Sequence, residues 1–237
     1  MDLVQEIKKE LLRYSDPVKA DFLPKFFKTG PGGYAEGDIF VGVTVPHQRK
    51  AAKKFFRQAT LADVEKLLRD PVHEFRLTAL FMLIYRYEKL VGEAEKKAVV
   101  DFYLANTAYI NNWDLVDASA DKILGAYLLD KEKDILYRLA GENDIWKQRM
   151  AVLATFHFIK QNRYDDTLRI AALLLNHRHD LIQKAVGWML REIGKRDFAV
   201  EIAFLEQHYR QMPRTMLRYA IERFDEGLRQ QFLKGLV

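Results

Sequence analysis

The chain has 237 residues and no cysteine, and its 38 Lys and Arg residues against 33 Asp and Glu residues give a formal net charge of +5. Its length and a hydrophobic content of 49% predict one large domain, residues 1–237, with a continuous core. The lack of cysteine excludes disulfides, thiolate metal sites and a cysteine nucleophile, and it favours a cytoplasmic location. The acidic amino terminus and the absence of an apolar run of ~18 residues predict neither a signal peptide nor a membrane span.

Helical spacing begins at Leu3 and recurs along the whole chain. Asp16 followed by Pro17 predicts a cap and the first residue of a second helix, and Pro46 starts a strongly basic third one. The glycine-rich segment 29–45 lacks the Gly-Lys-Ser/Thr of a phosphate-binding loop, so we interpret it as an ordered surface loop. No strand pattern interrupts the later helices, which are predicted at residues 60–68, 71–88, 93–107, 112–128, 131–140, 144–161, 164–175, 180–195, 198–210, 213–223 and 225–236. The sequence therefore predicts an all-α protein.

Similar sequence recurs at the start of the second helix of successive helical pairs. A cation is followed by apolar residues at Arg76, Arg149, Lys184 and Arg218, with spacings of 73, 35 and 34 residues, the first being about two of the shorter steps. Such a period is typical of helical repeats. Two-helix units of this size cannot bury their own apolar faces and stack on one another. We therefore predict a curved α-solenoid of antiparallel HEAT-like helical pairs with a concave basic groove.

The repeated cations form a row along the predicted groove, and Asp117 takes the middle position of that row between Arg76 and Arg149. Bases in a row suit a phosphodiester backbone, because affinity grows with the number of phosphates neutralised. A carboxylate in the row opposes such binding. It is explained if it faces a positive group, and both an ion pair with Arg149 and a cationic ligand fit this requirement.

Two tryptophans lie where stacking or chemistry is possible. Trp113 and Asp117 lie one helical turn apart, along the margin of an apolar stripe. This margin also suits a packing residue followed by an acid near a helix start. Trp188 shares a helical face with Lys184 and Arg191, and aromatic rings among cations are what stacking on bases combined with backbone contact requires.

Other kinds of active site find little support in the sequence. His177 and His179 lie in a turn without a third ligand, so no metal is predicted. No Gly-x-Ser-x-Gly nucleophile motif is present, and nothing else suggests covalent catalysis or a cofactor.

Several segments together carry a more specific signal: YAEGD at 34–38, FVGV at 40–43, WDLVD at 113–117, IWKQR at 145–149 and IQKAVGWMLRE at 182–192. With Lys28-Thr29-Gly30, Pro46 and Arg49-Lys50, they resemble the AlkD-type DNA alkylation repair glycosylases, a family built from HEAT-like repeats. The resemblance spans most of the chain. One departure is Asn112, which stands where some members have a second aromatic residue.

The resemblance implies a monofunctional glycosylase that hydrolyses the N-glycosidic bond of cationic N3- or N7-alkylated purines in duplex DNA and leaves an abasic site. It implies that Asp117 is the catalytic carboxylate, that Trp113 and Trp188 line the lesion site, and that Arg149 contacts the DNA backbone. We expect a monomer that needs no cofactor and no membrane. The DNA-binding residues expected are Arg76, Lys184, Arg191, Arg218, Thr44, Arg49 and Lys50.

Two other functions are compatible with the fold. The first is a non-catalytic HEAT-like module that binds DNA by charge and shape, with Asp117 held in a salt bridge; it predicts salt-sensitive binding without base release. The second is a protein-binding scaffold, which predicts exposed apolar ridges along the groove. The predicted row of cations argues against that scaffold.

Overall fold

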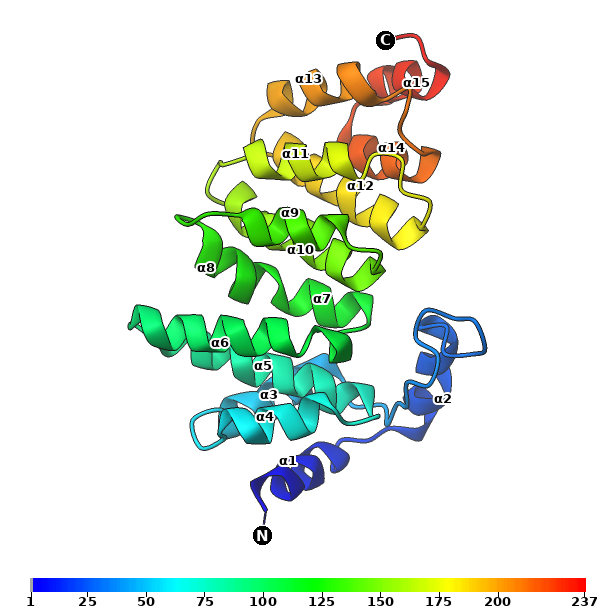
Figure 1. Cartoon of the computed structure of the whole chain (residues 1–237). Helices are drawn as coiled ribbons and strands as arrows, with labels where there is room; N and C mark the ends of the chain where they lie inside the picture. The colour runs from blue at the N-terminus through cyan, green and yellow to red at the C-terminus, as the bar shows by residue number, and fades with distance from the viewer. Residues whose placement is uncertain (1) are drawn as a thin grey trace. The chain divides into compact units, whose positions relative to one another are not determined.

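The computed structural model of the protein describes residues 2–237, which form helices joined by mostly short connections, with one long loop over residues 27–44 (Figure 1). Within that range no strand forms, and Ile39 and Val72 make one isolated parallel bridge. The all-α class is therefore confirmed. The chain divides after Ser119 into two compact units, here called unit 1 (to Ser119) and unit 2 (Ala120–Val237).

Unit 1 is built around one interior helix, α5. Its helices are α1 (Leu3–Leu12), α2 (Pro17–Phe26), α3 (Val45–Phe55), α4 (Leu61–Leu68), α5 (His73–Lys89), α6 (Glu93–Ala105), a 3-10 turn (Thr107–Tyr109) and α7 (Trp113–Ser119). Every side chain from His73 to Ile84 is buried, and α3, α4 and α7 all pack against α5. A helix that is buried all round needs internal partners for each of its polar side chains.

The helix starts of unit 1 follow the local sequence signals. The Asp16 carboxylate accepts hydrogen bonds from the backbone N–H groups of Val18 and Lys19, at 3.0 and 3.2 Å, and Pro17 opens α2. Thr60 and Asp63 exchange side-chain and backbone hydrogen bonds at the start of α4. Both pairings satisfy N–H groups that have no partner inside the helix.

The predicted helix over 112–128 is not continuous. After α7, residues Asp121–Gly125 form a π-helical turn that leads into α8 (Ala126–Leu128). The Gly125 N–H donates to Ala120 O at 2.9 Å, five residues back. A Cβ at Gly125 would lie 2.1 Å from Ala154 O, so glycine permits the close approach of the backbone of α10.

Unit 2 continues with paired helices. They are α9 (Asp134–Gly141), α10 (Ile145–Ile159), α11 (Asp165–Leu173), α12 (Asp180–Gly194), α13 (Phe198–His208), α14 (Arg214–Ala220), a 3-10 turn (Ile221–Arg223) and α15 (Glu226–Lys234). The second helices of successive pairs, α10, α12 and α14, pack on one another in that order, as HEAT-like pairs do. The curved solenoid and its groove stay predictions.

Each helix of residues 2–237 is too short or too polar to cross a bilayer.

Candidate functional site

Trp113, the first residue of α7, is held by the segment that precedes α3. Its indole N–H donates to Tyr34 Oη at 3.1 Å. The indole ring stacks on Phe27, with centroids 5.2 Å apart and planes inclined by 17°, and it meets the edge of Phe26 at 6.0 Å. The orientation of Trp113 therefore depends on α2 and on the loop that follows it.

Asp117 lies one turn after Trp113, and both side chains are half-buried. Leu115 and Val116, between them, are fully buried. Trp113 and Asp117 therefore lie at the margin of the apolar face of α7, as the sequence predicts. A half-buried carboxylate interacts more strongly with nearby charges than an exposed one, because water screens it on one side only.

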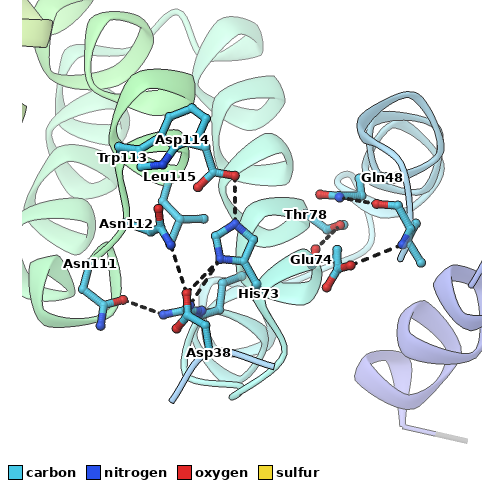
Figure 2. A network of polar contacts seen from close by, with 12 residues as sticks. Asp38, Gln48, His73, Glu74, Thr78, Asn111, Asn112, Trp113, Asp114 and Leu115 are labelled. Atoms are coloured by element: carbon cyan, nitrogen blue, oxygen red, sulfur yellow. Dashed lines mark hydrogen bonds and ion pairs between the residues drawn. The ribbon is translucent and has the colours of Figure 1, made fainter. Parts of the chain in front are cut away.

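A buried histidine joins α5 to the loop and to α7 (Figure 2). His73 is 2% exposed, and its Nδ1 lies 3.1 Å from Asp38 Oδ2 while its Nε2 lies 2.8 Å from Asp114 Oδ2. Burial alone lowers the pKa of His73, but the charge of Asp114 and the hydrogen bonds to both carboxylates outweigh it and raise the pKa to about 9. His73 is therefore an imidazolium at neutral pH.

Further polar groups complete this network around Asp38. The Arg76 guanidinium lies 2.5 Å from Asp38 Oδ1 and donates to Asn111 Oδ1, and Asn112 Nδ2 donates to Asp38 Oδ2 at 3.1 Å. Burial raises the pKa of Asp38, but the hydrogen bond from His73 and the charge of Arg76 lower it below its usual value. We call Asp38, His73, Arg76 and Asp114, with Asn111 and Asn112, the Asp38 network.

A second buried carboxylate, that of Glu74, fixes the loop between α2 and α3. Glu74 Oε1 accepts from the N–H groups of Val41, Gly42 and Val43 at 3.1, 2.8 and 3.2 Å. Gly42 has φ +78°, and a Cβ there would lie 2.1 Å from Asp16 O. The glycine is therefore required by both the backbone conformation and the close contact.

A cavity of about 370 Å³ opens beside Trp113 within unit 1. Its walls are mainly apolar, and the lining residues include Leu23, Phe26, Phe27, Phe40, Val43, Leu77 and Trp113, with Lys19, Gln48 and His73 among the polar ones. Its volume lies in the range of small-molecule sites.

Two of the residues predicted to act on DNA, Arg76 and Arg149, are buried. The sequence predicts Arg76 as a groove-lining cation, but Arg76 is 5% exposed and its guanidinium is paired within the Asp38 network. This is not the accessible position that a phosphate contact requires. Arg149, the fifth residue of α10, is also 5% exposed and donates to the backbone O of Leu181, which links α10 to α12.

The other predicted residues of unit 2 lie nearer its surface. Trp188 is half-buried and donates to Glu192 Oε1 at 3.1 Å, with Phe156 5.8 Å away. Lys184 lies 2.8 Å from Asp180, and Arg191 is ion-paired with Glu222. Arg218 is exposed.

Three predicted contacts lie at the start of α3. Thr44 Oγ1 lies 3.1 Å from His47 Nδ1, Arg49 lies 3.9 Å from the ring centroid of Phe81, and Lys50 is exposed.

Glu201 on α13 allows a test of burial in unit 2. It is 2% exposed, and burial raises its pKa from 4.5 to about 8, which nearby Arg191 opposes. A raised pKa means that its contribution to stability is complete below pH 4.5 and is lost as the pH rises through 8.

We expect Glu201→Gln to be more stable than the wild type by about 1–3 kcal/mol at pH 8.5 and equal to it near pH 4.5. Thermal unfolding followed by circular dichroism measures this, and Glu206→Gln, at an exposed position of α13, is the control. Equal stability of Glu201→Gln and the wild type at pH 8.5 would contradict the assignment.

Among the residues that the structure describes, no cluster of three or more His, Asp or Glu side chains is arranged to hold a metal ion.

Comparison with known proteins places the chain in a family. A family model described as "DNA alkylation repair enzyme" matches residues 7–224. A solved structure, a predicted DNA alkylation repair enzyme from Enterococcus faecalis, is similar with a TM-score of 0.70 and 17% identity, over 90% of this chain and 97% of that one, which shows a shared fold. No curated protein matches. Because the family model covers nearly the whole sequence, the chain belongs to the DNA alkylation repair enzyme family.

Proposed function

We propose that the protein is a monofunctional DNA glycosylase that releases N3- or N7-alkylated purines from duplex DNA. Membership of the family supports a role in the repair of alkylated DNA. The observation that carries the enzymatic part is the placement of Asp117 on α7, half-buried and one turn from the stacked indole of Trp113.

The proposed reaction needs little acid catalysis. A purine alkylated at N3 or N7 is cationic, so it departs with the electron pair of the C1′–N bond and becomes neutral. The deoxyribose then develops positive charge, which the carboxylate of Asp117 stabilises while it orients a water molecule towards C1′. The water oxygen bonds to C1′, and its proton passes to Asp117 or to solvent. The products are the free base and an abasic site in an uncut strand.

The remaining assignments follow from the resemblance of the segments at 113–117, 145–149 and 182–192 to the glycosylase family. We assign Trp113 and Trp188 to packing and cation–π contacts with the alkylated base or the sugar. The resemblance assigns Arg149 to the DNA backbone; because Arg149 is as buried as Arg76 and donates to Leu181 O, this contact requires its guanidinium to leave that carbonyl.

DNA binding is assigned to cations that the structure leaves accessible. Lys50 and Arg218 are exposed, and Arg49, Lys184 and Arg191 are partly exposed; the hydroxyl of Thr44 is assigned with them. Arg76 is left out because it is buried and paired with Asp38. Because cations that neutralise phosphates release counterions, binding is expected to weaken steeply as salt rises.

A base-release assay tests the proposal. Purified protein is incubated with methylated duplex DNA, and free 3-methyladenine and 7-methylguanine are measured by chromatography against a protein-free control. We expect both bases, with strand breaks appearing after alkali treatment and not before it. Salt-sensitive duplex binding with no base released would instead favour the non-catalytic DNA-binding module.

A further inference from the structure

The start of α7 is fixed by a charged histidine and two carboxylates from different segments (Figure 2). Asp38 comes from the loop before α3, His73 opens α5, and Asp114 lies in the first turn of α7. A neutral imidazole carries one N–H, so it donates to one carboxylate and turns a lone pair towards the other. Both contacts are therefore favourable together when His73 carries both protons.

We propose that His73 is a positioning residue of the glycosylase site: its imidazolium, held between Asp38 and Asp114, orients the start of α7 and so places Trp113 and Asp117 for reaction. Loss of the second proton breaks this clamp and lowers the rate of base release. The inference rests on the proposed function for its catalytic consequence, while the clamp itself is independent of it.

The connection from the clamp to Trp113 is direct. Asn112, just before Trp113, donates to Asp38 at 3.1 Å, and Asp114, just after it, contacts His73 at 2.8 Å. The backbone O of Asn112 accepts the N–H of Val116 at 3.1 Å, in the first turn of α7. A shift of the clamp therefore moves the helix start on which the indole and, one turn later, Asp117 are carried.

The aromatic contacts supply a second connection. The Phe27 ring lies 5.0 Å from the His73 ring and 5.2 Å from the Trp113 ring, between centroids. Phe40 stacks on the imidazole of His73, with the two ring centroids 4.7 Å apart. A rotation of His73 therefore displaces Phe27, the ring on which Trp113 stacks.

The charges that face His73 decide the pH range of the effect. Asp38 from the loop and Asp114 from α7 favour the imidazolium, while Arg76, whose Nη2 lies 3.4 Å from His73 Nδ1, opposes it. Glu74, the next residue of α5, is a buried carboxyl group whose own pKa is raised, mainly by burial. With His73 protonated, two cations balance the two aspartates of the network. Because the pKa of His73 is raised to about 9, the clamp persists at neutral pH and is lost as the pH rises through 9, whereas the stability that the raised pKa contributes is complete below pH 6.5.

Fluorescence of Trp113 tests the clamp without reference to catalysis. In a variant with Trp146→Phe and Trp188→Phe, Trp113 is the one tryptophan left. We expect its emission to titrate with a midpoint near pH 9 and this transition to disappear when His73→Gln is added. Asp114→Asn removes the main group that favours the imidazolium, so it is expected to move the midpoint to lower pH. A transition that persists in His73→Gln, or a midpoint that Asp114→Asn leaves in place, would overturn the proposal.

Single-turnover excision of 7-methylguanine tests the catalytic consequence, with uncatalysed release subtracted at each pH. The wild-type rate is expected to fall with pH above 9, by about tenfold per unit, because it follows the protonated fraction. In His73→Gln we expect a rate at pH 7 lowered about 10- to 100-fold, no such fall above pH 9, and duplex affinity within about threefold of the wild type. An unchanged rate in His73→Gln would contradict the positioning role.

The matched control is His208→Gln, a half-buried histidine of α13 that packs on Phe204. It should keep the wild-type rate and pH profile. Failure of the two proposals can be told apart. If methylated DNA yields no free base while the fluorescence transition of Trp113 depends on His73, the glycosylase assignment is wrong and the clamp stands.

Discussion

Asp117→Asn is expected to lower the single-turnover rate of 7-methylguanine release by about 10²- to 10³-fold. Asparagine has nearly the same shape, so α7 and the stacking of Trp113 on Phe27 should persist. What is lost is the negative charge that stabilises the sugar as it becomes cationic. Removing that charge also removes repulsion with phosphates, so duplex binding should stay intact or become tighter. Rapid-quench release of labelled base and a fluorescence binding titration measure the two effects.

The control for this substitution is Asp101→Asn on α6. Asp101 is exposed and pairs with Lys97 one turn earlier, so it changes the net charge equally. Its release rate should equal that of the wild type. If Asp117→Asn also released the base at the wild-type rate, Asp117 would have no part in the mechanism.

Asp38→Ala is expected to lower the free energy of unfolding of unit 1 by about 3–5 kcal/mol, because it leaves two buried cations without their shared carboxylate. Those cations are His73 and Arg76, which are 2% and 5% exposed. The thermal midpoint should fall by about 6–20 °C. Trp113 emission in the single-tryptophan variant reports this transition.

Asp101→Ala is again the comparison, because an exposed ion pair on a helix contributes about 0.5 kcal/mol or less. A loss below about 1 kcal/mol in Asp38→Ala would mean that removing the ions from water costs nearly as much as their pairing returns, and the Asp38 network would then have little net effect on stability.

The helices could be predicted from the sequence because their signals are local. Asp16-Pro17 and Thr60 with Asp63 each act within one turn, and the structure begins α2 and α4 at those positions. The all-α class follows from such signals repeated along the chain. The family resemblance was likewise carried by short segments, and the family model confirms it.

The Asp38 network could not be predicted, because its partners are far apart in the sequence. His73 contacts Asp38 and Asp114 across 35 and 41 residues. A signal was nevertheless present: His73, Glu74 and Arg76 open a helix that is otherwise largely apolar, and polar groups on a buried helix require partners. Periodicity reveals this requirement, but it does not identify the partners.

The break after α7 has a similar cause. The sequence predicts one helix over 112–128, since no proline interrupts it. The π-helical turn at Asp121–Gly125 accompanies the approach of Ala154 O to Gly125, a contact made across 29 residues. The same reason applies to Arg76. Its repeat position predicts a cation that lines the groove, but in the structure it is buried and paired with the carboxylate of Asp38, which the repeat does not reveal.

The hydrogen bonds that Glu74 accepts from three successive amides have a consequence for limited proteolysis. The backbone at Val41–Val43 is organised by a carboxylate that belongs to the first turn of α5, so an extended and cleavable conformation becomes accessible when that turn frays. Cutting at residues 41–43 therefore reports the opening of α5, more than 30 residues away in the sequence. Limited proteolysis of the intact protein would therefore measure how often the buried start of α5 opens.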